Sequence, residues 1–249
     1  MNPRFFCAEP MRVGSALQLP PEIAHHAVRV LRLRAGAPIV LFDGSGGEYR
    51  ARLRTEGRVA TGLVEAYDPV ERESPLGLVL VQALPAGDKL DWIVEKAVEL
   101  GVSAIVPVVA ERSVVRLSGE RAEKRLAHLR GVARAACEQC GRNRVPVVEP
   151  IEALGTCLSR SRDWPGLRVV LSPEGAASVA GPPSAPRKVA LLVGPEGGWS
   201  DAELKAIRVA GWEALALGTR ILRTETAGLA ALAVMQARWG DFRPSAGEA

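Results

Sequence analysis

Apolar and polar residues alternate strictly over residues 48–54. A period of two is typical of an antiparallel strand with one face in the core and the other in water. The apolar run 38–42 and residues 59–67 predict further strands on either side. Residues 1–70 therefore predict a small β domain, either a barrel or a sandwich. The water-facing side of residues 48–54 carries an arginine row, which consists of Arg50, Arg52 and Arg54.

A short helix is predicted to begin at Pro20-Pro21, because proline fits the first turn of a helix. Its apolar stripe has four residues at helical spacing, Ile23, Ala27, Val30 and Leu31. Its opposite face carries Arg29 and Arg32, which we take as candidates for RNA contacts.

The pattern changes after residues 68–75, a charged segment with two prolines that is typical of a linker. Strands and helices then alternate, which favours an open parallel sheet with helices on both faces. We therefore expect two domains, 1–70 and 71–249. The expected strands are 76–84, 104–109, 168–171, 188–193 and 213–217. The expected helices are 88–100, 118–140, one that begins with a capping box at Ser200 and Glu203, and 226–239.

The charge of the chain favours a polyanionic partner only where it is concentrated. The net charge is +4, but residues 111–144 alone hold nine Lys and Arg against four Asp and Glu. Most of the basic residues are arginines. A GC-rich genome or thermal adaptation explains this composition as well as a polyanionic partner does. No run approaches the roughly 18 apolar residues that a membrane span needs. The first residues lack the apolar segment of a signal peptide, so we expect a cytoplasmic protein.

The four cysteines predict neither a disulfide framework nor a zinc site. Cys137 and Cys140 form a C-x-x-C pair at the end of a predicted helix, where a redox pair is not usual, and no second pair accompanies them. We expect buried, reduced thiols and no bound metal. The motifs of serine hydrolases and zinc peptidases are also missing.

Two loops follow predicted strands, where open α/β sheets bind their ligands. The first, residues 193–200, contains three glycines but matches neither a P-loop nor a dinucleotide-binding fingerprint. The second, residues 217–227, gathers arginines, a glutamate and threonines at a helix N-terminus. Each loop also has a purely structural interpretation, a glycine-rich turn for the first and a helix cap by Thr224 or Thr226 for the second.

These loops closely resemble the RsmE family, the bacterial 16S ribosomal RNA uracil-N3 methyltransferases of the SPOUT superfamily. The resemblance rests on Gly194-Pro195-Glu196-Gly197-Gly198, on Leu217-Gly218 and on the segment 221–227 (ILRTETA). It extends over nearly the whole chain. The other matching residues are Arg4-Phe5-Phe6, His26, Val30-Leu31-Arg32, Lys89, the segment 95–102, Glu138-Gln139, Arg142-Asn143 and Val145-Pro146.

The resemblance implies a SPOUT domain with a deep trefoil knot, a PUA-like N-terminal β-barrel that binds RNA, and a homodimer. It also implies S-adenosylmethionine as the cofactor and 16S ribosomal RNA or the small ribosomal subunit as the partner. The implied cofactor contacts are Leu171, Leu192, Gly194, Glu196, Gly197, Leu217, Gly218, Ile221, Leu222 and Thr226.

Methylation at uridine N3 requires loss of the imide proton, which spreads negative charge onto O2 and O4. We expect Arg223 to stabilise that anion, with Glu225 or Glu138 positioning the base or taking the proton. We assign RNA contacts to Arg29, Arg32, the arginine row, Lys89, Arg142 and Asn143. Two other classes are alternatives: a nucleotide-binding oxidoreductase, which would need a dinucleotide fingerprint, and a non-catalytic RNA-binding protein, which is the stronger alternative.

Overall fold

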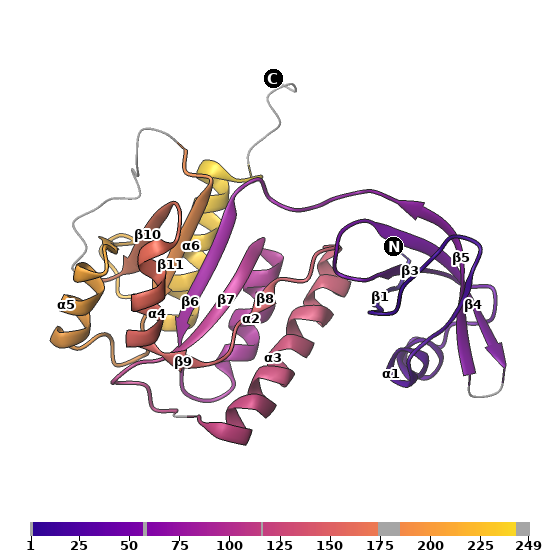
Figure 1. The fold of residues 1–249 in the computed structure, drawn as a ribbon, viewed down its shortest axis with the longest axis horizontal. Coiled ribbons are helices and arrows are strands. Elements are labelled where there is room, and N and C mark those ends of the chain that lie inside the picture. The colour runs from indigo at the N-terminus through magenta and orange to yellow at the C-terminus, as the bar shows by residue number, and fades with distance from the viewer. Residues whose placement is uncertain (1, 57–58, 116, 174–184, 243–249) are drawn as a thin grey trace. The chain divides into compact units, whose positions relative to one another are not determined.

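The computed structural model describes residues 2–56, 59–115, 117–173 and 185–242 (Figure 1). The chain forms two compact units, which we describe separately. Unit 1 consists of residues 1–73 and 134–145, and unit 2 of residues 74–133 and 146–249. The sequence pattern gives no sign that residues 134–145 belong with the N-terminal part of the chain.

The described residues of unit 1 form a five-stranded sheet in the order β1-β3-β4-β5-β2. Its strands are β1 (Arg4–Phe6), β2 (Ala16–Gln18), β3 (Pro38–Phe42), β4 (Glu48–Glu56) and β5 (Val59–Asp68). β1 and β3 are parallel, and the other neighbours are antiparallel. The three predicted strands are confirmed. β1 and β2 have three residues each, which is too short for a period of two to stand out.

The predicted apolar stripe of the first helix is only partly correct. Helix α1 (Pro21–His25) continues as a π-helix, η1 (His26–Val30), and Ala27 is fully buried as expected. Val30 and Leu31, however, are 60% and 42% exposed. A π turn holds more residues than an α turn, so positions beyond it rotate away from the face that α-helical spacing assigns to them.

A buried polar network holds residues 134–145 within unit 1. The Arg4 guanidinium is paired with Glu48 at 2.5 Å and donates to Asn143 Oδ1 at 2.6 Å. Arg142 is paired with Glu73 and is itself buried. Buried charges are stable when they are paired in this way, and removing one partner leaves the other uncompensated.

Unit 2 contains a parallel sheet in the order β12-β10-β11-β6-β7-β8, with β9 also paired to β7. The open parallel sheet predicted from the alternation of elements is thus confirmed. The strands are β6 (Gly77–Ala83), β7 (Val102–Val109), β8 (Val147–Val148), β9 (Glu152–Ala153), β10 (Leu167–Leu171), β11 (Lys188–Val193) and β12 (Glu213–Leu215).

Helices cover both faces of this sheet, as predicted (Figure 1). The helices α2 (Lys89–Glu99) and α6 (Thr224–Trp239) pack together on one face. The other face carries α4 (Leu154–Arg160), the 3₁₀ turn η2 (Ser161–Asp163) and α5 (Asp201–Val209). The long helix α3 (Gly119–Cys140) ends within unit 1. The capping box of Ser200 and Glu203 at the start of α5 is confirmed.

All four cysteines are free, and three of them are buried. Burial raises the pKa of Cys137 and of Cys157 to about 12, so both thiols stay protonated at neutral pH. Within the described ranges, no group of three His, Cys, Asp or Glu residues is placed to hold a metal ion. No helix in those ranges is long and apolar enough to cross a membrane.

Candidate active site

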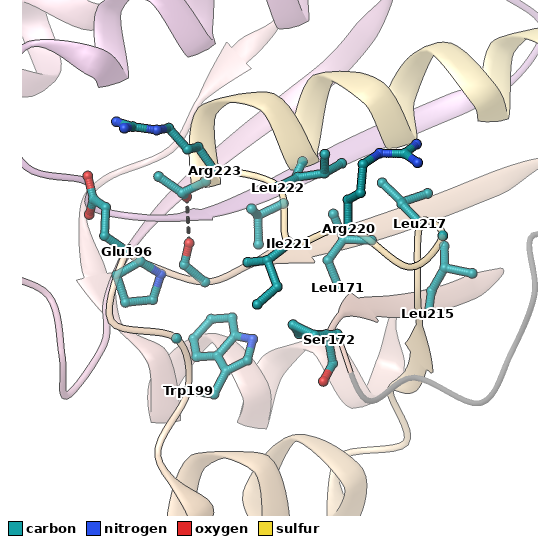
Figure 2. A pocket seen from close by; sticks show the side chains of 18 of the residues that line it. Leu171, Ser172, Glu196, Trp199, Leu215, Leu217, Arg220, Ile221, Leu222 and Arg223 are labelled. Carbon is teal, nitrogen blue, oxygen red and sulfur yellow. Dashed lines mark hydrogen bonds between the residues drawn. The ribbon is translucent and has the colours of Figure 1, made fainter.

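A cavity of about 560 Å³ lies in unit 2, at the carboxyl ends of β10, β11 and β12. Three segments that follow these strands supply most of its lining, namely 171–173, 193–199 and 215–224 (Figure 2). In parallel sheets the carboxyl ends of neighbouring strands meet at one edge, so distant parts of the chain converge there. Its size is within the range of small-molecule sites.

Two glycines give the lining loops their course. Gly198 has φ +66° and Gly218 has φ +80°, both in the left-handed region that glycine adopts without strain. Neither would bring an added Cβ within 4 Å of another group, so the backbone conformation alone favours glycine at these positions.

The lining differs from one side of the cavity to the other (Figure 2). The side chains of Leu171, Leu215 and Leu217 gather on one side together with Arg220, whereas Glu196 and Arg223 lie on the opposite side. Trp199 forms part of the wall between them. A ligand with an apolar ring at one end and charged groups at the other matches this division.

Lys89 links two carboxylates on the charged side. Its Nζ lies 2.8 Å from Glu196 Oε1 and 3.4 Å from Glu225 Oε2. The pKa of Lys89 is raised, first by the hydrogen bond to Glu196 and also by Glu225. Burial raises the pKa of Glu196, but hydrogen bonds from Lys89 and from the Ala86 amide outweigh burial and hold this pKa below its ordinary value. The ammonium group therefore keeps Glu196 ionised beside the cavity.

Seven of the ten expected cofactor residues line this cavity. They are Leu171, Gly194, Glu196, Leu217, Gly218, Ile221 and Leu222. Leu192 is fully buried in the core. A Cβ on Gly197 would lie 3.1 Å from Arg112 Cβ, and Thr226 is exposed on the first turn of α6. These three residues are not among those that line the cavity.

Several lining residues are not among the ten expected cofactor contacts, Ser172, Trp199, Leu215, Arg220 and Thr224 among them. A tryptophan after a glycine-rich loop suggests core packing, so Trp199 gives no signal by itself. Thr224 lies at the start of α6, but the N-cap residue is Arg223 and no side chain caps the helix. The alternative interpretation of this loop, in which Thr224 or Thr226 caps the helix, is therefore wrong.

The three residues expected to act in catalysis lie in different places. Arg223 lines the cavity, and Glu225 approaches it through its ion pair with Lys89. Glu138 belongs to unit 1, where it accepts a hydrogen bond from the Phe6 amide at 2.8 Å. Burial raises the pKa of Glu138, and the Phe6 amide offsets part of that shift.

The residues expected to contact RNA also fall into two groups. Arg29, Arg32 and the arginine row are exposed on unit 1, although Arg52 is paired with Glu65. Arg142 and Asn143 are buried in the network with Glu73 and Arg4, and Lys89 is engaged with Glu196. Within the basic segment 111–144, Arg116 lies outside the described residues.

Two family models match the chain. The RNA methyltransferase domain matches residues 72–236, and the RNA methyltransferase PUA domain matches residues 19–58. Among curated proteins, the chain is 36% identical over 222 residues to ribosomal RNA small subunit methyltransferase E of Bacillus subtilis. The match covers 86% of this chain and 87% of that protein. The protein of the same name from Mycobacterium tuberculosis is 33% identical over 229 residues, and the match covers 86% of this chain and 84% of that protein.

Two solved structures are similar over nearly their full length. A ribosomal RNA small subunit methyltransferase E from Neisseria gonorrhoeae, bound to S-adenosylmethionine, has a TM-score of 0.89 and 41% identity, covering 98% of this chain and 100% of that one. A putative methyltransferase from Legionella pneumophila, also in complex with that cofactor, has a TM-score of 0.92 and 34% identity, covering 97% and 99%.

Proposed function

Since the chain belongs to the ribosomal RNA small subunit methyltransferase E family, we propose that it transfers the methyl group of S-adenosylmethionine to N3 of a uridine in 16S ribosomal RNA. The cavity at the ends of β10, β11 and β12 carries this proposal. A non-catalytic RNA-binding protein would have no use for a cavity with this division of apolar and charged walls, and the relatives are named as enzymes.

The residues of the cavity fit this cofactor. The leucine side suits the adenine ring, because apolar walls bury a flat aromatic group. The side with Glu196 and Lys89 suits the amino and carboxylate groups of the methionine portion, because each charge finds an opposite charge there. When bound, S-adenosylmethionine supplies a methyl group that is already activated by its sulfonium.

The remaining work of the protein is to orient the uridine and to favour its N3 anion. Arg223 stabilises the charge that develops on O2 and O4, since a guanidinium is most effective where charge appears in the transition state. Glu225, placed near the cavity by Lys89, is the group that takes or directs the N3 proton. Glu138 is assigned to holding β1 against the end of α3 instead.

RNA binding is assigned to the exposed arginines of unit 1, Arg29, Arg32 and the arginine row. The match to a PUA domain over residues 19–58 supports this assignment, because it covers all five residues. Lys89, Arg142 and Asn143 are given positioning roles, because their side chains already pair with protein groups.

The proposal includes four finer features that the family resemblance implies. The chain of unit 2 forms a trefoil knot, the sheet of unit 1 closes into a barrel, the protein acts as a homodimer, and it works in the cytoplasm on the small subunit or its RNA. The convergence of three loops on one cavity supports the knot, since a knot would bring such loops together.

Deletion of the gene tests this function in cells. Mass spectrometry of nucleosides from 16S ribosomal RNA should show 3-methyluridine in the parent strain and lose it in the deletion strain. Complementation with the wild type should restore the modification, and Arg223→Ala should not. An unchanged 3-methyluridine content in the deletion strain would contradict the proposed activity.

A further inference from the structure

Trp199 carries a buried hydrogen-bond donor with no acceptor. The residue is 8% exposed, and its indole Nε1 has no hydrogen-bond partner among the described residues. A buried N–H without an acceptor costs roughly 1–3 kcal/mol, so such groups call for an explanation. Trp199 also lines the cavity of the proposed cofactor.

Trp212 shows how the protein satisfies a comparable indole when it serves only the core. Trp199 and Trp212 belong to the same hydrophobic cluster. Trp212 is 3% exposed, and its Nε1 donates to Ser161 Oγ at 3.1 Å. The difference between the two tryptophans is therefore the acceptor and not the degree of burial.

Gly194 lies directly against one side of the indole. A Cβ at this position would lie 3.0 Å from Trp199 Cε2 and 3.2 Å from Nε1, so any side chain would press on the ring. The nitrogen-bearing edge of the ring faces the side of the cavity where Ser172 and Ile221 lie, away from Glu196 (Figure 2). The donor thus points toward the leucine side of the site.

We propose that the Trp199 indole N–H donates a hydrogen bond to the adenosine portion of the bound cofactor, through a ring nitrogen or a ribose oxygen. The inference rests on the proposed function and names one binding residue for it. The methionine portion belongs on the charged side, with Glu196 and Lys89. A ligand acceptor on the leucine side must therefore come from the nucleoside.

The test compares Trp199→Phe with the matched variant Trp212→Phe, using calorimetry with S-adenosylhomocysteine, the product left after methyl transfer. Trp199→Phe should weaken binding roughly threefold to tenfold, the effect of one hydrogen bond. Trp212→Phe should lower thermal stability and leave the affinity unchanged, because its N–H is satisfied within the core. If Trp199→Phe does not fold, benzothienylalanine at position 199 keeps the ring shape without the N–H.

Nuclear magnetic resonance of the indole N–H groups locates the acceptor directly. The Trp199 signal should move downfield with S-adenosylhomocysteine and with adenosine, but not with methionine. An unmoved signal together with unchanged affinity of the Trp199 variants would overturn the inference while leaving the proposed function in place. If the wild type binds neither S-adenosylmethionine nor its product, the proposed function fails, and this inference fails with it.

Discussion

The hydroxyl of Thr224 donates to the Gly194 carbonyl at 2.5 Å, joining the first turn of α6 to the glycine-rich loop after β11. The same hydroxyl accepts from Gln82 Nε2 at 3.0 Å, and Gln82 is fully buried at the end of β6. One threonine thus connects three elements that are far apart in the sequence. The connection fixes the two loops against each other at the cavity.

Thr224→Val keeps the shape of this side chain and removes its hydroxyl. Gly194 O and Gln82 Nε2 each lose a partner in a buried place, so the free energy of unfolding should fall by about 1–3 kcal/mol. Affinity for S-adenosylmethionine should fall as well, because the loops lose their mutual support. Denaturation and calorimetry measure the two effects. Thr156→Val, at an exposed position on α4, is the control and should change neither.

Lys89→Met tests the ion pairs on the charged side of the cavity. The lowered pKa of Glu196 means that its pairing stabilises the protein above the ordinary Glu range and is lost as the pH falls through the lowered pKa. The raised pKa of Lys89 means that the stability contributed by its ammonium group is present below the ordinary Lys range and is lost as the pH rises through the raised pKa. The stability difference between wild type and variant should therefore be greatest between about pH 5 and 10.

Lys96→Met is the matched control for Lys89. Lys96 lies on the same helix, with side-chain exposure of 33% against 31%, and pairs with Glu95 and Glu99. Both variants lose ion pairs, but only Lys89→Met should weaken cofactor binding. Equal cofactor affinity in the two variants at neutral pH would show that Glu196 needs no support from Lys89.

Arg223→Ala should bind the cofactor almost normally and methylate slowly. Removing one donor that acts mainly in the transition state typically costs on the order of 10²–10³ in rate. Raising the pH should restore part of the rate, because solvent then supplies more of the N3 anion. Single-turnover methylation across pH measures this, with Arg208→Ala on α5 as an exposed control. Loss of cofactor binding with an unchanged chemical step would place Arg223 in cofactor binding.

Replacing the arginine row by alanine should weaken RNA binding and flatten its salt dependence. Each lost phosphate contact lowers the slope of log affinity against log salt by about 0.7–0.9. The triple lysine variant keeps the charge and should keep most of the slope. Binding titrations at several salt concentrations compare the three proteins. A triple alanine variant with an unaltered slope would show that the arginine row is solvated and makes no contact with RNA phosphates.

Local signals in the sequence were sufficient for much of unit 2. The capping box at Ser200 and the buried run 188–193 are set by neighbours along the chain, and both elements are confirmed. Residues 134–145 are different, because Arg4, Glu48 and Glu73 determine where they pack. Their partners are too distant in sequence for any periodicity to indicate them.

In the site, too, some features follow from neighbours in the sequence and others from distant residues. The position of Gly194 and Glu196 after a strand predicted a ligand loop, because the ends of parallel strands meet at one edge. The pairing of Lys89 with Glu196 spans more than a hundred residues, and a lysine at the start of a helix carries no sign of it. The unpaired N–H of Trp199 depends on which acceptors the fold leaves within reach, and only coordinates show that.

Methyl transfer by the purified protein tests the central claim most directly. The protein is incubated with 16S ribosomal RNA or small subunits from a strain without the gene and with S-adenosylmethionine labelled in its methyl group. The RNA is then digested and its nucleosides are identified by mass spectrometry. We predict that the label appears as 3-methyluridine at a single position and that Arg223→Ala incorporates far less. Label in another nucleoside, or none with either substrate, would contradict the account.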